Sequence, residues 1–329
     1  MERKIKSLLV LLIMKPTNLL HSLLLISAIG LSACEDHPDS PDASFPERIN
    51  FVADRQYPEG IAYSSQLAKF LVTSIPLGKV GTVSTDGRYE DLLTAPELIS
   101  GIGMKVAGNR VFVCNSDRGL SIKSTPAGTF QTAELLVFDL NTRQLERRTK
   151  LDALIPAAER NFANDVTLAP DGTAYVTDSF SPVIYKVGPD GTASVLARDE
   201  VNFSSPNFGL NGILYHPGGF LIVANTGQGK LFKVDLQNGN LVSEITGTGP
   251  LPGDGLTLLN NDLYVVTGGS RVAQLRSTDN WQTAAIVKFD EGVYTGATTS
   301  VAVNNQIYTL NARIGAIGDA KDFSIQRFR

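Results

Sequence analysis

Four side chains with oxygen donors occupy matching places in the chain, each at the start of a stretch of alternating apolar residues. Two are carboxylates and two are amides: Glu59, Asn164, Asn211 and Asp254. Calcium takes about six to eight oxygen ligands in flexible geometry, so these four would suffice once waters or a substrate complete the shell. No cysteine or histidine stands at these positions, which disfavours zinc and copper. The residue types therefore predict a site for a divalent cation, most readily Ca²⁺.

A purely structural interpretation of the same residues stays open. Asn and Asp often bond backbone groups two residues further on and so cap the start of a strand or turn. That habit accounts for one or two of the positions. It does not account for carboxylate or amide side chains at four of six equivalent places in a repeating chain.

Other catalytic chemistry finds little support in the sequence. There is no G-x-S-x-G elbow, H-E-x-x-H motif, Walker loop or G-x-G-x-x-G motif. A serine triad lacks a usable histidine, because His216 lies in a Pro-Gly-Gly turn that we expect away from the centre. Glu59 and Asp254 could form a glycosidase pair, but not while both bind a metal. Cys114 ends the apolar run VFVC and is expected to be a buried thiol.

The four candidate ligands lie in internal repeats of the chain, and the fold of these repeats must bring them together. The clearest unit spans residues 164–191, where two strands are joined by a Pro-Asp-Gly turn and a third strand ends in another. Similar units recur about 43 to 47 residues apart, with one longer step of about 62 that contains an insertion near residues 117–133; the period matches a four-stranded propeller blade. The six units begin at entrance positions Glu59, Ile102, Asn164, Asn211, Asp254 and Thr299.

Strand counting predicts how the ring closes. The last unit ends after its third strand, whereas residues 48–53 form an extra strand at the beginning. We expect residues 48–53 to pair with residues 323–328, which hides sheet edges that would otherwise pair with other chains. The predicted fold is all-β, a six-bladed β-propeller with four-stranded blades and little helix. A solenoid would need capping repeats, and none is visible. Second strands end in residues expected to serve turns: Asn115, Asp178, Asn225 and Asn311.

Four short motifs carry a family resemblance that covers residues 48–329. In order and spacing, Pro58-Glu59-Gly60, Asn164-Asp165, Asn211-Gly212 and Asp254-Gly255 resemble the metal-ligand motifs of the senescence marker protein / gluconolactonase family. They are also similar to those of diisopropyl fluorophosphatase and, more distantly, paraoxonase. The resemblance implies a divalent cation held by Glu59, Asn164, Asn211 and Asp254, with Asp254 also the general base or nucleophile. The chain departs from the paraoxonase pattern, because no histidine is placed to act as a base.

Two functions of different classes follow. The first is a metal-dependent hydrolase of lactones or related esters, in which the cation polarises the carbonyl and Asp254 activates water or attacks directly. The second is a non-catalytic surface propeller that binds a small ligand, a sugar or a protein partner. A lipid anchor, the poor match of the second blade, where Ile102 makes the entrance apolar, and the missing histidine favour the second function. The intact set of four oxygen ligands favours the first.

The N-terminal residues read as an export signal. Residues 23–33, LLLISAIGLSA, form an apolar run too short to span a bilayer, and Leu31-Ser32-Ala33-Cys34 resembles a bacterial lipobox. We therefore expect residues 1–33 to be a signal peptide, Cys34 to be lipidated and residues 34–47 to be an acidic, proline-rich tether. The protein would then be exported and lipid-anchored to the bacterial outer membrane, on its periplasmic or surface face. Met14 begins a complete signal by itself, so either Met1 or Met14 could be the start.

Charge and cysteine content narrow the partners. The net charge is −4, and without residues 1–33, which hold four basic residues and one acidic residue, it is −7. Nucleic-acid binders present a basic patch, so nucleic acid is not an expected partner. With Cys34 lipidated, Cys114 cannot form an internal disulfide. We expect a monomer that meets a small-molecule substrate and touches the membrane only through its lipid.

Overall fold

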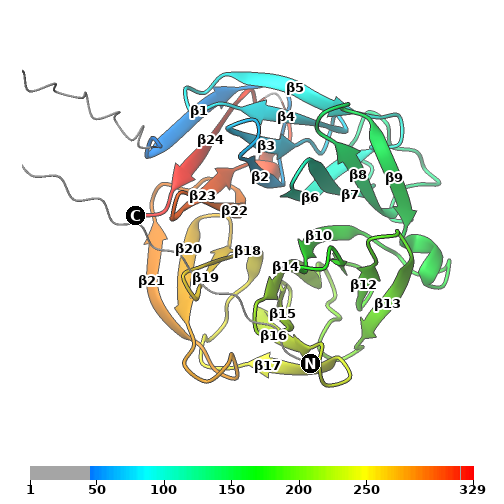
Figure 1. The fold of residues 1–329 in the computed structure, drawn as a ribbon, viewed down its shortest axis with the longest axis vertical. Helices are drawn as coiled ribbons and strands as arrows, with labels where there is room; N and C mark the ends of the chain where they lie inside the picture. Colours follow the sequence, from blue (N-terminus) through cyan, green and yellow to red (C-terminus); the bar gives the residue numbers. More distant parts are fainter. Residues whose placement is uncertain (1–44, 319) are drawn as a thin grey trace, which may run out of the picture. The chain divides into compact units, whose positions relative to one another are not determined.

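A computed structural model describes residues 45–318 and 320–329. The predicted signal peptide, the predicted lipidation at Cys34 and the predicted tether up to residue 44 lie outside the described residues. The described chain forms six four-stranded antiparallel sheets arranged as blades around a central axis (Figure 1). The predicted all-β, six-bladed propeller is confirmed.

Blades 1 to 5 follow one plan, in which consecutive strands run from the innermost to the outermost position. Blade 1 contains β2 (Ile61–Ser64), β3 (Lys69–Thr73), β4 (Lys79–Val83) and β5 (Tyr89–Thr94). Blade 2 contains β6 (Ser100–Ala107), β7 (Arg110–Ser116), β8 (Ala133–Asp139) and β9 (Leu145–Lys150). Blade 3 contains β10 (Ala163–Leu168), β11 (Ala174–Asp178), β12 (Val183–Val187) and β13 (Ala193–Arg198).

The remaining blades repeat this order until the last strand. Blade 4 contains β14 (Leu210–His216), β15 (Phe220–Asn225), β16 (Lys230–Asp235) and β17 (Leu241–Ile245). Blade 5 contains β18 (Gly253–Leu259), β19 (Asp262–Thr267), β20 (Arg271–Arg276) and β21 (Ala285–Glu291). Blade 6 contains β22 (Ala297–Val303), β23 (Gln306–Asn311), β24 (Asp322–Arg327) and, outermost, β1 (Arg48–Val52).

Helical structure is sparse in the described residues, as the sequence predicts. Two 3₁₀ turns occur, η1 (Asp152–Leu154) and η2 (Ile314–Ala316). No helix within residues 45–318 and 320–329 has the length and apolar character needed to cross a bilayer.

The ring closes through the first and last strands, as strand counting predicts. β1 pairs antiparallel with β24, in a register that runs from Arg48 opposite Gln326 to Val52 opposite Asp322. Side chains alternate along β1, so that Ile49 and Phe51 enter the core while their neighbours face outward. The core contact begins before β1, because Phe45, which the sequence analysis placed in the tether, packs against aromatic rings of blades 1 and 6.

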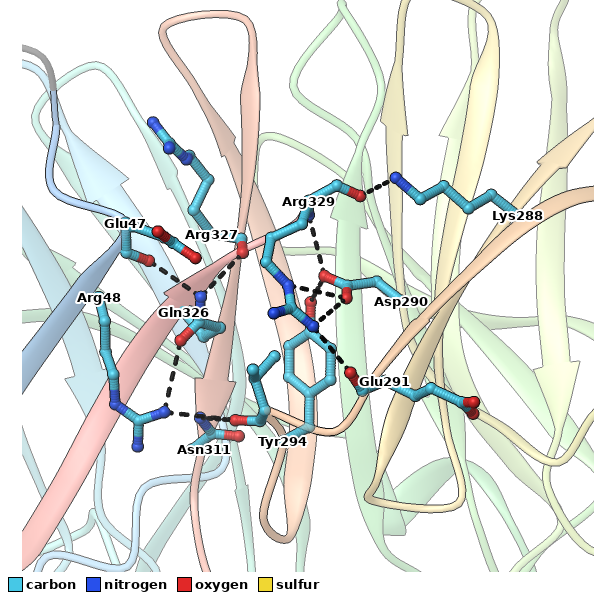
Figure 2. Close-up of polar contacts among 11 residues, drawn as sticks. Glu47, Arg48, Lys288, Asp290, Glu291, Tyr294, Asn311, Gln326, Arg327 and Arg329 are labelled. Atoms are coloured by element: carbon cyan, nitrogen blue, oxygen red, sulfur yellow. Dashed lines mark hydrogen bonds and ion pairs between the residues drawn. The ribbon is translucent and has the colours of Figure 1, made fainter.

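The C-terminal residue ties blade 6 to blade 5 (Figure 2). Nη2 of Arg329 lies 2.9 Å from Oδ1 of Asp290 on β21, and its backbone N–H donates to Oδ2 of the same side chain at 2.9 Å. Tyr294 donates its hydroxyl to Asp290 at 2.8 Å, and Lys288 donates to the backbone oxygen of Arg329. Burial tends to raise the pKa of Asp290, but the hydrogen bonds from Arg329 and Tyr294 outweigh it and lower the pKa. These contacts therefore favour the ionised carboxylate.

We expect Asp290→Asn to lower the melting temperature by several degrees. The amide removes the charge that Arg329 and Tyr294 share, and a hydrogen bond to a charged group contributes about 1.5–3 kcal/mol. Differential scanning calorimetry measures the effect. Glu244→Gln is the matched control, because its ion pair with Lys230 is solvent-exposed and contributes little. Equal melting temperatures for the two variants would show that this contact does not stabilise the ring.

Candidate metal centre

A β-bulge at the start of each inner strand of blades 2 to 6 brings the entrance positions to the channel. On β10, for example, Ala163 pairs with Asp178 and Val166 with Val176, so two residues, Asn164 and Asp165, stand opposite one. A bulge bends the strand and re-aims a side chain. The same irregularity occurs on β6, β14, β18 and β22.

The four predicted ligands lie in one cavity of about 420 Å³. Glu59, just before β2, lines it together with the bulge residues Asn164, Asn211 and Asp254. Entrance residues of four different blades thus line one cavity, and their approach to within coordination range of one point stays a prediction. Ile102 also lines the cavity and makes the second entrance position apolar, as the sequence analysis stated.

The sixth entrance position is Thr298, and the assignment to Thr299 is wrong by one residue. The bulge on β22 falls between Ala297 and Ser300, and its first residue, Thr298, lines the cavity. The Thr298 hydroxyl donates to the backbone oxygen of Glu59 at 2.8 Å and so links blade 6 to blade 1. Thr299 takes the second bulge position and faces Gly255 of blade 5.

The glycine after an entrance residue serves close packing. A Cβ on Gly60 would lie 2.3 Å from the backbone oxygen of Ile102, and one on Gly212 would lie 2.1 Å from that of Asp254. Neighbouring inner strands approach so closely that a side chain does not fit. The Glu-Gly, Asn-Gly and Asp-Gly pairs are therefore explained by the narrow channel, whereas in sequence they look like ordinary turn signals.

Hydrogen bonds fix which way the two amides face. Ser179 uses its proton to reach the backbone oxygen of Leu210 at 2.7 Å, so it can only accept from Nδ2 of Asn164, at 2.8 Å. Thr226 likewise donates to Gly253 at 2.6 Å and accepts from Nδ2 of Asn211 at 3.1 Å. Each amide therefore has its oxygen free for the cavity.

Ser179 and Thr226 were not among the residues expected at the site. The available signal was that each follows directly on the polar residue that ends the second strand, in Asp178-Ser179 and Asn225-Thr226. Their role depends on carbonyl groups of the next blade, 31 and 27 residues further along the chain.

Two oxygens of the predicted ligand set have no partner. Oε2 of Glu59 and Oδ1 of Asn164 are buried and accept no hydrogen bond from the described part of the chain. Leaving a buried acceptor unsatisfied costs about 1–3 kcal/mol, so each one requires an explanation. A cation bound between them would provide it.

The raised pKa values of the two carboxylates also indicate a cation site. Burial, then the charges of Asp254 and Asp165, raises the pKa of Glu59 well above its ordinary value. Burial and the charge of Asp165 raise the pKa of Asp254 to about 8, although a hydrogen bond from Asn211 opposes the shift. Like charges in a desolvated site repel, and a divalent cation would remove this penalty. The donor set therefore fits a hard cation.

The fit depends on the amides as well as the carboxylates. Across residues 45–318 and 320–329, no group of three or more His, Cys, Asp and Glu side chains is placed to hold a metal. Asp165, the third carboxylate nearby, already accepts from the backbone N–H groups of Val166 at 2.8 Å and Ile213 at 3.4 Å. The candidate site is thus the mixed set of two carboxylates and two amides.

The other sequence candidates lie away from this cavity. His216 stacks on Phe220 with a ring separation of 4.3 Å and accepts the indole N–H of Trp281 at 3.2 Å, so its expected place away from the centre is confirmed. Cys114 is fully buried, as predicted. The second-strand ends hold loops through backbone bonds, also as predicted: Asn115, Asp178, Asn225 and Asn311.

No protein-family model matches the sequence, and no curated protein matches it. Several solved structures resemble the described fold. The Malassezia sympodialis allergen Mala s 1 superposes with a TM-score of 0.68 at 19% identity, covering 86% of this chain and 96% of the allergen. A gluconolactonase from Xanthomonas campestris gives 0.59 at 16% identity over 86% and 91% of the two chains.

The shared feature is the fold. A streptogramin B lyase also superposes, with a TM-score of 0.55 at 10% identity over 85% of this chain and 98% of the lyase. Proteins of different activities thus share the propeller. The predicted similarity to gluconolactonases holds for the architecture, and the chemistry must be argued from the site.

Proposed function

We propose that the protein is a divalent-cation-dependent hydrolase of lactones or related esters, with its active site in the central cavity. The observation that carries the proposal is the pair of orphaned acceptors, Oε2 of Glu59 and Oδ1 of Asn164, beside a second carboxylate of raised pKa. If these side chains only capped turns, their oxygens would accept hydrogen bonds from backbone N–H groups. These oxygens instead remain available in a cavity large enough for a small ester.

Glu59, Asn164, Asn211 and Asp254 would hold the cation, and Ca²⁺ suits their oxygens best. When bound, it would polarise the substrate carbonyl and stabilise the negative charge that develops on its oxygen. Ser179 and Thr226 keep the two amides in the binding orientation. The pKa shifts described above belong to the metal-free protein.

We assign the proton transfer to Asp254. Its carboxylate could take a proton from a water that attacks the carbonyl carbon, and then return it to the leaving oxygen. Alternatively, it could attack that carbon itself and be released by water. Both routes add one water across the ester bond and yield a carboxylate and an alcohol.

Apolar residues form much of the rest of the cavity. Ile75, Phe162, Phe208 and Ile314 line it beside the candidate ligands. An apolar wall excludes water from the bound ester and strengthens the electrostatic interactions at the carbonyl.

A metal-removal assay tests the proposal. The purified protein would be treated with EDTA and assayed against a panel of γ- and δ-lactones and aryl acetates, before and after Ca²⁺, Mg²⁺ or Mn²⁺ is restored. We expect hydrolysis to fall to background with EDTA and to return with Ca²⁺. If calorimetry detects no Ca²⁺ binding and no lactone or ester is hydrolysed, the non-catalytic surface propeller becomes the better account.

The predicted membrane anchor belongs to the same proposal. We propose that Cys34 carries the lipid and that the propeller acts outside the cytoplasm of a bacterium. The support is the Leu31-Ser32-Ala33-Cys34 sequence after an apolar run.

A further inference from the structure

Arg118 lines the cavity that holds the candidate metal ligands, and the sequence analysis did not single it out. It follows β7 at the beginning of the insertion in blade 2. Its guanidinium carbon lies 4.7 Å from the centre of the Phe208 ring. Its Nε–H is buried and has no hydrogen-bond partner in the described residues, where no ion pair to Arg118 occurs either. The side chain as a whole is half-buried, and a partly desolvated cation without an anion is suited to bind an anionic ligand.

The wall beside Arg118 is aromatic. Phe162 and Phe208 line the cavity, and their ring centres lie 6.0 Å apart. Phe180 packs on Phe208 at 5.0 Å, and Arg160 lies over Phe180 at 4.4 Å. Burial and the positive charge of Arg160 lower the pKa of Arg118, so an anion here would relieve both effects.

Hydrogen bonds hold the loop on both sides of Arg118. The preceding residue, Asp117, is fully buried, and its carboxylate accepts from the N–H of Gly119 at 2.7 Å and the hydroxyl of Ser124 at 2.6 Å. The Lys123 ammonium donates to the backbone oxygens of Gly78, Ala95 and Leu98 at 2.9–3.0 Å. The loop backbone around Arg118 is therefore held, and the guanidinium itself rests on the Phe208 ring. From this position it can bind a carboxylate through two parallel hydrogen bonds.

Few other donors remain for a neutral, hydroxyl-rich substrate. The Thr226 and Thr298 hydroxyls already donate to backbone oxygens. Ser100 is the remaining hydroxyl in the lining, and most of the other wall residues are apolar or glycine. A sugar lactone would leave most of its hydroxyl groups unpaired against such a wall.

We propose that the substrate is an anionic lactone or ester with an apolar body, whose carboxylate is bound by Arg118 while its ester group reaches the metal ligands. This inference rests on the proposed function only for the contact between the ester group and the metal ligands. The anion site is defined by Arg118 and the aromatic wall, so it can be tested without turnover.

The test measures binding of a matched pair of probes, 2-naphthoate and its neutral counterpart 2-naphthamide, by calorimetry in Ca²⁺ and in EDTA. We expect naphthoate to bind on the order of 10- to 100-fold more tightly than naphthamide in both buffers, as a charge-assisted bidentate contact allows. Arg118→Met should remove this preference, and Arg118→Lys should retain part of it. Arg147→Met is the control, because Arg147 donates to Pro189 outside this cavity; it should change nothing.

The outcomes separate the two proposals. A naphthoate preference that disappears in EDTA and survives Arg118→Met would place the carboxylate on the cation and overturn the inference. So would the failure of both probes to bind at millimolar concentration, or equal hydrolysis of neutral sugar lactones by the wild type and Arg118→Met. If Arg118 binds naphthoate but no ester is hydrolysed, the anion site stands and the hydrolase proposal fails.

Discussion

Asp254→Asn is expected to abolish hydrolysis and leave Ca²⁺ bound. Asparagine keeps the size of the side chain and one oxygen ligand, but it can neither accept a proton from water nor attack a carbonyl. Positioned acid–base groups contribute about 10²–10⁴-fold to a rate, so a loss of on the order of 10³-fold in kcat is expected. Steady-state kinetics at saturating Ca²⁺, with calorimetric titration of the metal, measures both effects.

As a control, the rate of Asp254→Asn is measured over a range of Ca²⁺ concentrations. If Asp254 acts only as a ligand, raising the Ca²⁺ concentration should restore the rate. A base or nucleophile cannot be replaced by more metal, so kcat should stay low when the site is full. Full recovery at high Ca²⁺ would remove Asp254 from the chemistry and leave it a ligand.

Labelled water separates the two roles of Asp254. When the enzyme exceeds the substrate in H₂¹⁸O, a general base sends the label into the product carboxylate in the first turnover. A nucleophile forms an acyl intermediate, and water that attacks the aspartyl carbon leaves the label in Asp254. Mass spectrometry of the peptide that contains Asp254 distinguishes these results.

The propeller could be predicted from the sequence because each blade repeats the same local signals. Turns rich in Gly, Asn and Asp, together with alternating strands, specify hairpins without reference to distant residues. Ring closure could be predicted because the last repeat has only three strands, whereas residues 48–53 form an extra strand before the first repeat. These inferences depend on pattern and counting, and the pairing of β1 with β24 confirms them.

The parts of the site that escaped prediction depend on contacts between blades. In the run Thr298-Thr299-Ser300, no local signal shows which threonine starts the bulge; the hydrogen bond to Glu59 does. Arg118 lies in an insertion that could be described only as a loop, because the contacts of Lys123 that hold this loop reach carbonyl groups of blade 1. Entrance side chains can be identified from chemical type, but the walls and supports around them depend on tertiary structure.

The electrostatics of the ligand set predict how the metal-free protein responds to pH. Folding raises the pKa of Asp254 from 3.8 to about 8, and it also raises that of Glu59. Between these values the folded state binds more protons than the unfolded state, so the free energy of unfolding decreases as pH rises. In EDTA we therefore expect the melting temperature to fall between about pH 4 and pH 8. Saturating Ca²⁺ should reverse much of this loss, by about 2.7 kcal/mol when the metal is at 100 times Kd.

Glu59→Gln should then have effects of opposite sign in the two buffers. In EDTA at pH 8 the variant removes one of the mutually repelling buried carboxylates, so its melting temperature should exceed that of the wild type. In Ca²⁺ it should be less stable than the wild type, because a ligand set with one charge fewer binds the cation more weakly, on the order of 10- to 100-fold. Calorimetric scans of both proteins, with Glu244→Gln as the surface control, measure the crossing. A variant with lower stability in EDTA and unchanged Ca²⁺ affinity would mean that Glu59 is a structural residue, and the orphaned oxygen would then need another explanation.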